Sequence, residues 1–217
     1  MTATASRDAD QLLALMRSRR VTRSFTGEPV AADDLRRMTE AARWATSAGN
    51  RHLHKFLIVR DPERLRLVRS AAPGMLAPPP ALIVILTDTE VAARESMQLE
   101  RDHSSWIDVG TAAMNMMLLA HALGLGTCPV TSFSRSAVSV MLDLPPHVIP
   151  ELMVMVGHPT ITDRGLRSGA PKPVTAGELT FWEAVGAHDP PASERRGAAG
   201  LPTDGSSLPS KPGAPTA

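Results

Sequence analysis

Residues 104–126 read SSWIDVGTAAMNMMLLAHALGLG, and this stretch predicts the longest helix of the chain, from Ser104 to Leu123. Gly124 is expected to end the helix, because glycine readily takes the left-handed conformation that follows many helices. The helix should bury a broad apolar face made of Trp106, Val109, Ala113, Met116, Met117 and Ala120. Its methionines, Met114 included, are expected to fill gaps in the core rather than to bind a ligand.

Buried strands are predicted on both sides of this helix. Residues 81–86 and 151–156 are largely apolar runs of the kind found in central strands, and residues 55–59 form a shorter one. Residues 127–132 predict a short strand or loop. Other helices are expected to begin where acidic, hydroxyl or proline residues favour a helix start, near Asp10, Asp33, Pro62 and Ser134.

The composition indicates one domain with appendages. The chain has 217 residues, of which 43% are hydrophobic, enough for a sizeable core. A net charge of +1 gives no global field that would attract nucleic acid or an acidic membrane. The single cysteine, Cys128, cannot form an intramolecular disulfide, and no stretch has the length of a signal-peptide core or a membrane span. We therefore expect a soluble, cytoplasmic protein that binds neither nucleic acid nor membrane.

The two ends of the chain differ in composition from its middle. Residues 1–9 are expected to be a flexible N-terminus and residues 10–186 the folded domain. Residues 187–217 are rich in Pro, Gly, Ser and Ala, with almost nothing apolar enough to pack. We expect this tail to be disordered unless it docks onto something else.

Several chemical motifs are missing from the sequence. It contains neither a phosphate loop ending in Gly-Lys-Ser/Thr nor a Gly-x-Ser-x-Gly elbow. His52 and His54 alternate as metal ligands can, but no third ligand follows at a recognisable spacing, so no metal site is expected.

Two clusters could bind a ligand. Arginines and hydroxyls in residues 19–25 would suit a phosphate, since guanidinium groups bind phosphate oxygens in pairs, yet basic residues also favour any helix end. Residues 43–50 end a helix in small and hydroxyl side chains, so that backbone can approach a flat ligand. A simple helix cap with a turn at Gly49 explains the second cluster equally well.

Taken together with their spacing, these clusters resemble the nitroreductase family. That family shows Arg-Arg-Ser-x-Arg-x-Phe and then Pro-Val, and later Ala-Arg-x-Ala-Pro-Ser-x-x-Asn. The matching stretches are residues 19–25, 29–30 and 42–50, followed by a central-helix signature at 108–127 and by residues 144–146 and 157–159. The resemblance covers most of residues 10–186. It departs from the family at Val21, which replaces a serine, and at His52-Leu53-His54, where Gln-Pro-Trp is common.

The resemblance implies an α+β fold of three layers, with a central, mostly antiparallel sheet flanked by helices, in an intertwined homodimer. FMN would lie at the subunit interface, and NAD(P)H would reduce it. The residues implied in FMN binding are Arg19, Arg20, Val21 and Arg23 at the phosphate, Thr46, Ser47, Ala48 and Asn50 from the partner subunit, Pro129, Val130, Thr131 and Ser132 beside flavin N5, and Arg167 or Lys172 as a last cation.

The function implied is ping-pong transfer of a hydride through FMN to a nitroaromatic, a quinone or a similar small organic acceptor. The chemistry would belong to the flavin, so no catalytic side chain is expected. Two alternatives stay open. Residues 128–133 and 141–150 are similar to the large subunit of cyclodipeptide oxidases, which oxidise cyclic dipeptides and assemble with a small partner protein. A flavin- or ligand-binding protein without turnover is the other alternative.

Overall fold

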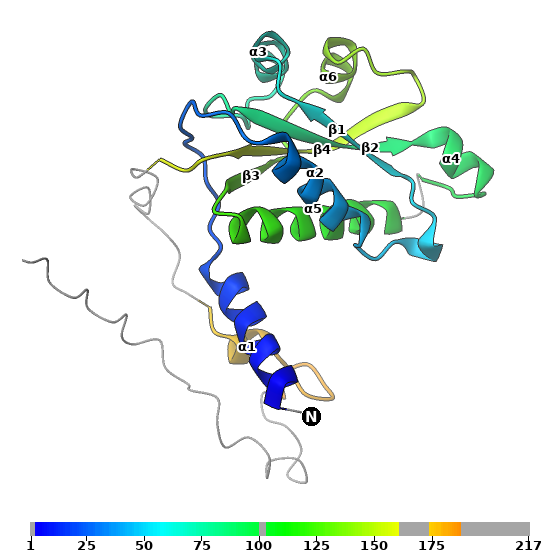
Figure 1. Cartoon of the computed structure of the whole chain (residues 1–217). Coiled ribbons are helices and arrows are strands. Elements are labelled where there is room, and N and C mark those ends of the chain that lie inside the picture. Colours follow the sequence, from blue (N-terminus) through cyan, green and yellow to red (C-terminus); the bar gives the residue numbers. More distant parts are fainter. Residues whose placement is uncertain (1–2, 100–102, 161–173, 188–217) are drawn as a thin grey trace, which may run out of the picture. The chain divides into compact units, whose positions relative to one another are not determined.

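The structure is a computed structural model that describes residues 3–99, 103–160 and 174–187 (Figure 1). The chain divides into two compact units, residues 1–166 and 167–217, and each is considered by itself. The first unit contains α1 (Ala3–Ser18), α2 (Ala32–Arg43), η1 (Ala48–Asn50), β1 (His54–Val59), α3 (Pro62–Ser70), β2 (Ala81–Asp88), α4 (Thr89–Arg94), α5 (Ser104–Ala122), β3 (Gly126–Val130), α6 (Arg135–Met141) and β4 (Val148–Gly157). In the second unit, the short helix α7 (Ala176–Leu179) begins at a capping box between Thr175 and Glu178.

The four described strands form one antiparallel sheet in the order β1-β2-β4-β3. Leu57 pairs with Val84, Ile83 with Val154, and Cys128 with Met155. The predicted runs 55–59, 81–86 and 151–156 all lie in these strands, and residues 127–130 lie in β3. The predicted α+β fold with an antiparallel sheet is therefore confirmed.

Helices cover both faces of the sheet, which gives the predicted three layers (Figure 1). On one face, α2 and α5 bury Leu35, Met38 and Met116 against alternate residues of β2 and β4. On the other, α3 and α6 bury Val68 and Val138 against the intervening residues. Since β2 is covered on both faces, its sequence is a continuous apolar run rather than an alternating one.

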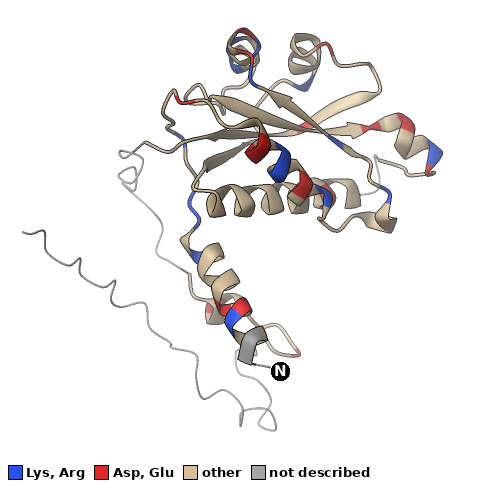
Figure 2. Ribbon diagram, in the orientation of Figure 1, with Lys and Arg blue, Asp and Glu red and all other residues tan. Residues whose placement is uncertain are grey.

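Charged side chains lie mainly on the outer helices, whereas the strands carry few of them (Figure 2). On α2, Arg36 pairs with Asp33 and Arg43 with Glu40, and on α3 Arg66 pairs with Glu63. These pairs are exposed and join residues one helical turn apart, so each contributes little to stability. They mark the solvent face of each helix.

The predicted ends of several helices are confirmed. Leu125 N–H donates to Ala120 O at 2.8 Å and Gly124 N–H to His121 O at 3.0 Å, with Gly124 at a φ of +77°. This is the Schellman pattern that ends a helix at a glycine. Asp61 caps α3 ahead of Pro62, and the Ser134 hydroxyl accepts the N–H of Ala137 at the start of α6.

Two predictions about the longest helix are wrong. Trp106 was expected on the buried face of α5 but is 62% exposed, and Met114 was expected in the core but is 43% exposed. Val109, Ala113, Met116, Met117 and Ala120 are buried as predicted, together with Ser105, Asp108 and Ala112. Met114 lies on the outer face of the helix. Trp106 has the same angular position as Ala113 and Met117 but lies in the first turn of the helix, where the Arg135 guanidinium is 5.8 Å from the centroid of its ring.

The first helix also differs from its prediction. It begins at Ala3 rather than near Asp10, so that the predicted flexible segment 1–9 is helical from Ala3 onward. Leu12, Leu13 and Met16 on this helix are each at least 40% exposed. The predicted limit of the domain at residue 186 and the predicted disorder of the tail stay predictions, because residues 161–173 and 188–217 lie outside the described ones.

Candidate functional site

The arginine segment that follows α1 is fixed to the first residues of β3 (Figure 1). Val21 pairs with Thr127, and Thr22 N–H donates to Thr127 O at 2.8 Å. Gly126 allows this approach, since a Cβ there would lie 2.6 Å from Thr22 Cβ. The sequence therefore places residues 19–23 along the edge of the sheet, beside β3.

The arginines of this segment are not equivalent. One guanidinium nitrogen of Arg19, Nη1, is buried and has no hydrogen-bond partner among the described residues. Arg20 instead turns back onto its own segment and donates to Arg19 O at 2.8 Å and to Arg17 O. A buried, unpaired cationic donor is costly unless a ligand satisfies it, so Arg19 is the stronger candidate for an anion contact.

Residues 129–132 continue β3 from this point. Val130 is 1% exposed and packs in the core under α3 and α6, so only its backbone could meet a ligand. Pro129 is half-buried, and Thr131 and Ser132 are exposed. Ser132 O accepts the N–H of Gly74 at 3.1 Å, which fixes the end of the segment. The pairing of Val21 and Thr22 with Thr127 places residues 19–23 beside the beginning of β3, whereas residues 129–132 lead away from its other end toward Gly74.

The second predicted cluster lies near the beginning of α5. Ala48 N–H donates to both carboxylate oxygens of Asp108, at 3.0 and 3.2 Å, and Thr111 Oγ1 donates to Thr46 O at 3.3 Å. Gly49 and Asn50 have φ values of +63° and +54°, a tight turn of the kind predicted there. Ser47 Oγ is buried without a partner in the described part of the chain, whereas Asn50 is exposed.

A cavity of about 490 Å³ opens beside this turn. Thr46, Ser47, His54 and Asp108 are among the residues that line it. His54 Nδ1 contacts Thr87 Oγ1 at 3.3 Å, and its Nε2 is buried with no partner at hydrogen-bonding distance within the described residues. Burial lowers the pKa of His54, while the negative charge of Asp108 opposes that shift. The imidazole is therefore neutral at pH 7, and the cavity offers two unsatisfied polar atoms to a ligand.

The two clusters lie at opposite ends of α5. Ser18, next to Arg19, contacts His121 Nε2 at 2.8 Å near the end of α5, whereas Ala48 is bound to Asp108 near its beginning. At about 1.5 Å per residue, these two anchor points are about 20 Å apart along the helix axis. Within one chain, Arg19 and Ser47 therefore do not adjoin.

Not every predicted residue can be placed, and some contributors were missed. Arg167 and Lys172 lie outside the described residues. Asp108 and the buried side of His54 were not predicted as site residues. The signal for Asp108 was its position three and four residues from Ser105 and Ala112, which makes it an acid on the buried stripe. Among the residues with described positions, no group of three His, Cys, Asp or Glu could hold a metal ion.

Within the described residues, none of the helices has the length and apolar content needed to cross a bilayer.

The sequence matches the model of the Nitroreductase family over residues 16–80 and 69–158. It is 28% identical over 170 residues to a protein of Thermus thermophilus named NADH dehydrogenase, covering 65% of this chain and 83% of the relative. It is also 26% identical over 174 residues to an FMN reductase (NADPH) of Bacillus subtilis, covering 73% of this chain and 70% of the relative. Among solved structures, an FMN-dependent nitroreductase of Clostridium difficile aligns with a TM-score of 0.60 at 22% identity, covering 77% of this chain and 94% of that one.

Proposed function

Because the chain belongs to the nitroreductase family, it is an FMN-dependent oxidoreductase reduced by NAD(P)H, and we propose that it passes the electrons to a nitroaromatic, a quinone or a similar small organic acceptor. The observation that carries this proposal is the buried, unpaired nitrogen of Arg19 beside the edge of β3. This nitrogen is a cationic donor that has no partner among the described residues. It lies in the stretch that matches the family's phosphate-binding pattern.

The residues present fit FMN. Arg19 and Arg23 would hold its phosphate, because guanidinium groups form charge-assisted hydrogen bonds to phosphate oxygens. Thr131 and Ser132 would lie along the ring, with a backbone N–H in reach of it. When bound, FMN accepts a hydride from one substrate and gives electrons to the next. The chain supplies orientation and positive charge near the flavin, so no acid or base side chain is required.

We propose that a second copy of the chain completes the site. The loop with Thr46, Ser47, Ala48 and Asn50 would contact the flavin held by Arg19 of the partner copy. Support comes from the separation of the two clusters along α5, because a twofold axis across α5 would bring the end of one helix beside the beginning of the other. Each dimer would then contain two equivalent sites.

The outer face of α5 suits such a contact. Ile107 is 64% exposed, Met114 lies on the same exposed side, and a Cβ added at Gly110 would meet no atom within 4 Å. Exposed apolar side chains around a glycine let another backbone approach closely, and such patches mark protein interfaces. A homodimer would bury the exposed Met114.

Asp108 and His54 would then shape the loop that each chain contributes to the flavin site of its partner. Asp108 accepts the N–H of Ala48 and so fixes the turn that carries Ser47. Ser47 Oγ and the neutral His54 Nε2 would offer a donor and an acceptor to the ring or to the second substrate in the same cleft. Substrate choice would depend on these contacts rather than on a catalytic side chain.

The test is to load the purified protein with FMN and mix it with NADPH or NADH in the absence of oxygen. Rapid loss of the flavin absorbance, its return on adding a nitroaromatic or a quinone, and parallel lines in double-reciprocal plots are expected. Bleaching by a cyclic dipeptide but not by NAD(P)H would overturn the proposal in favour of the cyclodipeptide oxidase alternative. Bound FMN that nothing bleaches faster than free FMN would favour a binding protein without turnover.

A further inference from the structure

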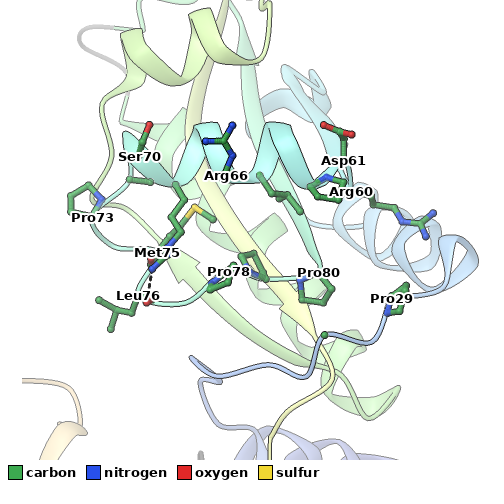
Figure 3. A pocket seen from close by; sticks show the side chains of 16 residues that line it. Pro29, Arg60, Asp61, Arg66, Ser70, Pro73, Met75, Leu76, Pro78 and Pro80 are labelled. Atoms are coloured by element: carbon green, nitrogen blue, oxygen red, sulfur yellow. Dashed lines mark hydrogen bonds between the residues drawn. The ribbon is translucent and has the colours of Figure 1, made fainter.

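A groove of about 1220 Å³ lies between α3 and the loop that follows it (Figure 3). Figure 3 shows Asp61 just before α3 and Arg66 on it, with Pro78 and Pro80 across the groove and Pro29 near one end. None of the residues proposed to bind FMN is among those that line it. The groove is large enough for a small organic molecule.

The groove has an apolar floor and rigid walls. Leu65, Ala72 and Met75 form buried parts of the lining. Much of the rest is proline, whose fixed φ restricts backbone motion: Pro29, Pro62, Pro73, Pro78, Pro79 and Pro80. The loop is held on one side by Gly74 N–H, which donates to Ser132 O, and on the other by Arg69, which donates to Met75 O at 3.2 Å and Leu76 O at 3.3 Å. The groove is therefore formed without a ligand.

The charges around the groove are mostly positive. Arg60, Arg66 and Arg69 line it, and Asp61 is the acid in the lining. Arg66 already pairs with Glu63 at 2.7 Å, and Arg69 donates to backbone carbonyls of the loop. The Asp61 carboxylate accepts the N–H of Arg64 at 2.8 Å, so it is engaged in capping α3. Arg60 forms no ion pair with any residue that the structure describes. An apolar floor beneath a positive rim complements a molecule that is apolar along its length and anionic at one end.

We propose that this groove binds an organic anion with an aliphatic body, such as a medium-chain carboxylate, at a site separate from the flavin. The carboxylate would meet Arg60 at the rim, and the chain would lie over Leu65 and Met75 against the prolines. The lining contains no aromatic side chain, so it lacks a stacking surface for a nucleotide base. The proposal does not depend on the substrate of the flavin site.

Calorimetric titration of the FMN-loaded protein with octanoate tests this directly. Octyltrimethylammonium is the control ligand, because it has a similar alkyl chain length but a positive charge. Octanoate is expected to bind at one site per chain, at least about tenfold more tightly than the cation, because hydrogen bonds to charged groups dominate the difference. Arg60→Gln should weaken octanoate binding by about tenfold. Arg64→Gln on α3 is the control, since Arg64 does not line the groove.

A second variant tests the location. A Cβ at Gly27 meets no atom within 4 Å, so Gly27→Phe can fill the mouth of the groove without a backbone clash, and it should abolish octanoate binding while the bound flavin spectrum stays unchanged. Equal affinity for octanoate and octyltrimethylammonium, or wild-type octanoate binding by Gly27→Phe or by Arg60→Gln, would overturn the proposal.

Discussion

Arg19 and Arg20 are neighbours in the sequence, but their guanidinium groups have different surroundings. Arg20 donates to backbone carbonyls of its own segment, whereas Arg19 keeps a buried nitrogen without a partner in the described structure. The sequence pattern alone treated them as equal parts of one clamp. The difference depends on how the segment leaves α1 and joins β3, which composition and spacing do not encode.

Arg19→Ala is therefore expected to weaken FMN binding by about tenfold to a hundredfold, since a charge-assisted hydrogen bond contributes about 1.5–3 kcal/mol. Quenching of FMN fluorescence on titration with protein measures this affinity. Arg17→Ala is the matched control, because Arg17 lies in the last turn of α1 and is outside the proposed site. Equal affinities for Arg19→Ala and the control would remove Arg19 from the phosphate site.

The burial of His54 leads to a prediction about how the stability of the fold depends on pH. Burial lowers the pKa of His54 in the folded chain below the ordinary histidine value of about 6.5, so the unfolded chain binds the extra proton first as the pH falls. The stability contributed by the neutral imidazole is present above that value and is lost as the pH falls through the range below it. His54→Gln should therefore lose less stability than the wild type between pH 7.5 and pH 5.5.

Urea unfolding at the two pH values measures this difference. His52→Gln, which removes an exposed histidine from the same segment, controls for the loss of a histidine as such. The same drop in stability for wild type and His54→Gln would show that burial of His54 does not couple folding to protonation.

At the scale of elements, the contact between β3 and the arginine segment depends on one glycine. A Cβ at Gly126 would lie 2.6 Å from three atoms of the Thr22 side chain. Gly126→Ala should therefore destabilise the fold by about 1–3 kcal/mol, the usual cost of overpacking, and should weaken FMN binding by displacing residues 19–23. Chemical denaturation and the same fluorescence titration measure the two effects.

Thr22→Gly removes the atoms that the new methyl group would meet, so the double variant with Gly126→Ala should recover part of the lost FMN affinity. Gly27→Ala, at a position where an added Cβ meets no atom within 4 Å, should not reduce the stability of the fold. A Gly126→Ala protein with wild-type stability and affinity would mean that this close approach is unimportant.

The elements themselves were largely predictable. Continuous apolar runs marked β2 and β4, and capping residues marked the beginnings of α3 and α6, because these signals are local. The errors concern the exposure of single side chains rather than the elements themselves. Trp106 and Met114 lie on α5 as expected but are exposed in the single chain, because periodicity gives neither the width of the buried face nor the point along a helix where packing ends.

The site was predicted less completely than the fold. Motif order identified residues 19–23, 46–50 and 129–132, but not that the first of these pairs with the beginning of β3 while the second lies at the other end of α5. Asp108 was visible only as one acid in an apolar helix, and its bond to Ala48 depends on the turn at Gly49. Distances between segments that are far apart in the sequence are set by packing, which a single sequence does not reveal.

For the whole molecule, the account requires two chains. Ile107→Glu combined with Met114→Glu places like charges on the outer face of α5 and should give a monomer that has lost most of its FMN affinity, although both ligand clusters keep their sequence. Light scattering coupled to gel filtration measures the mass. Val140→Glu is the control, because Val140 is equally apolar and 78% exposed but lies on α6, over the other face of the sheet. A double variant that remains dimeric would exclude this face of α5 as the interface.

The most direct measurement concerns a site shared between two chains. Chains with Arg19→Ala and Arg23→Ala are mixed with chains carrying Ser47→Phe, native mass spectrometry confirms the heterodimers, and bound FMN is counted. Neither variant alone should hold FMN, whereas each heterodimer should hold about one, since one of its two equivalent sites keeps both the arginines and the Ser47 loop. Heterodimers that form but bind no more FMN than either parent would contradict the shared site and with it the proposed mode of flavin binding.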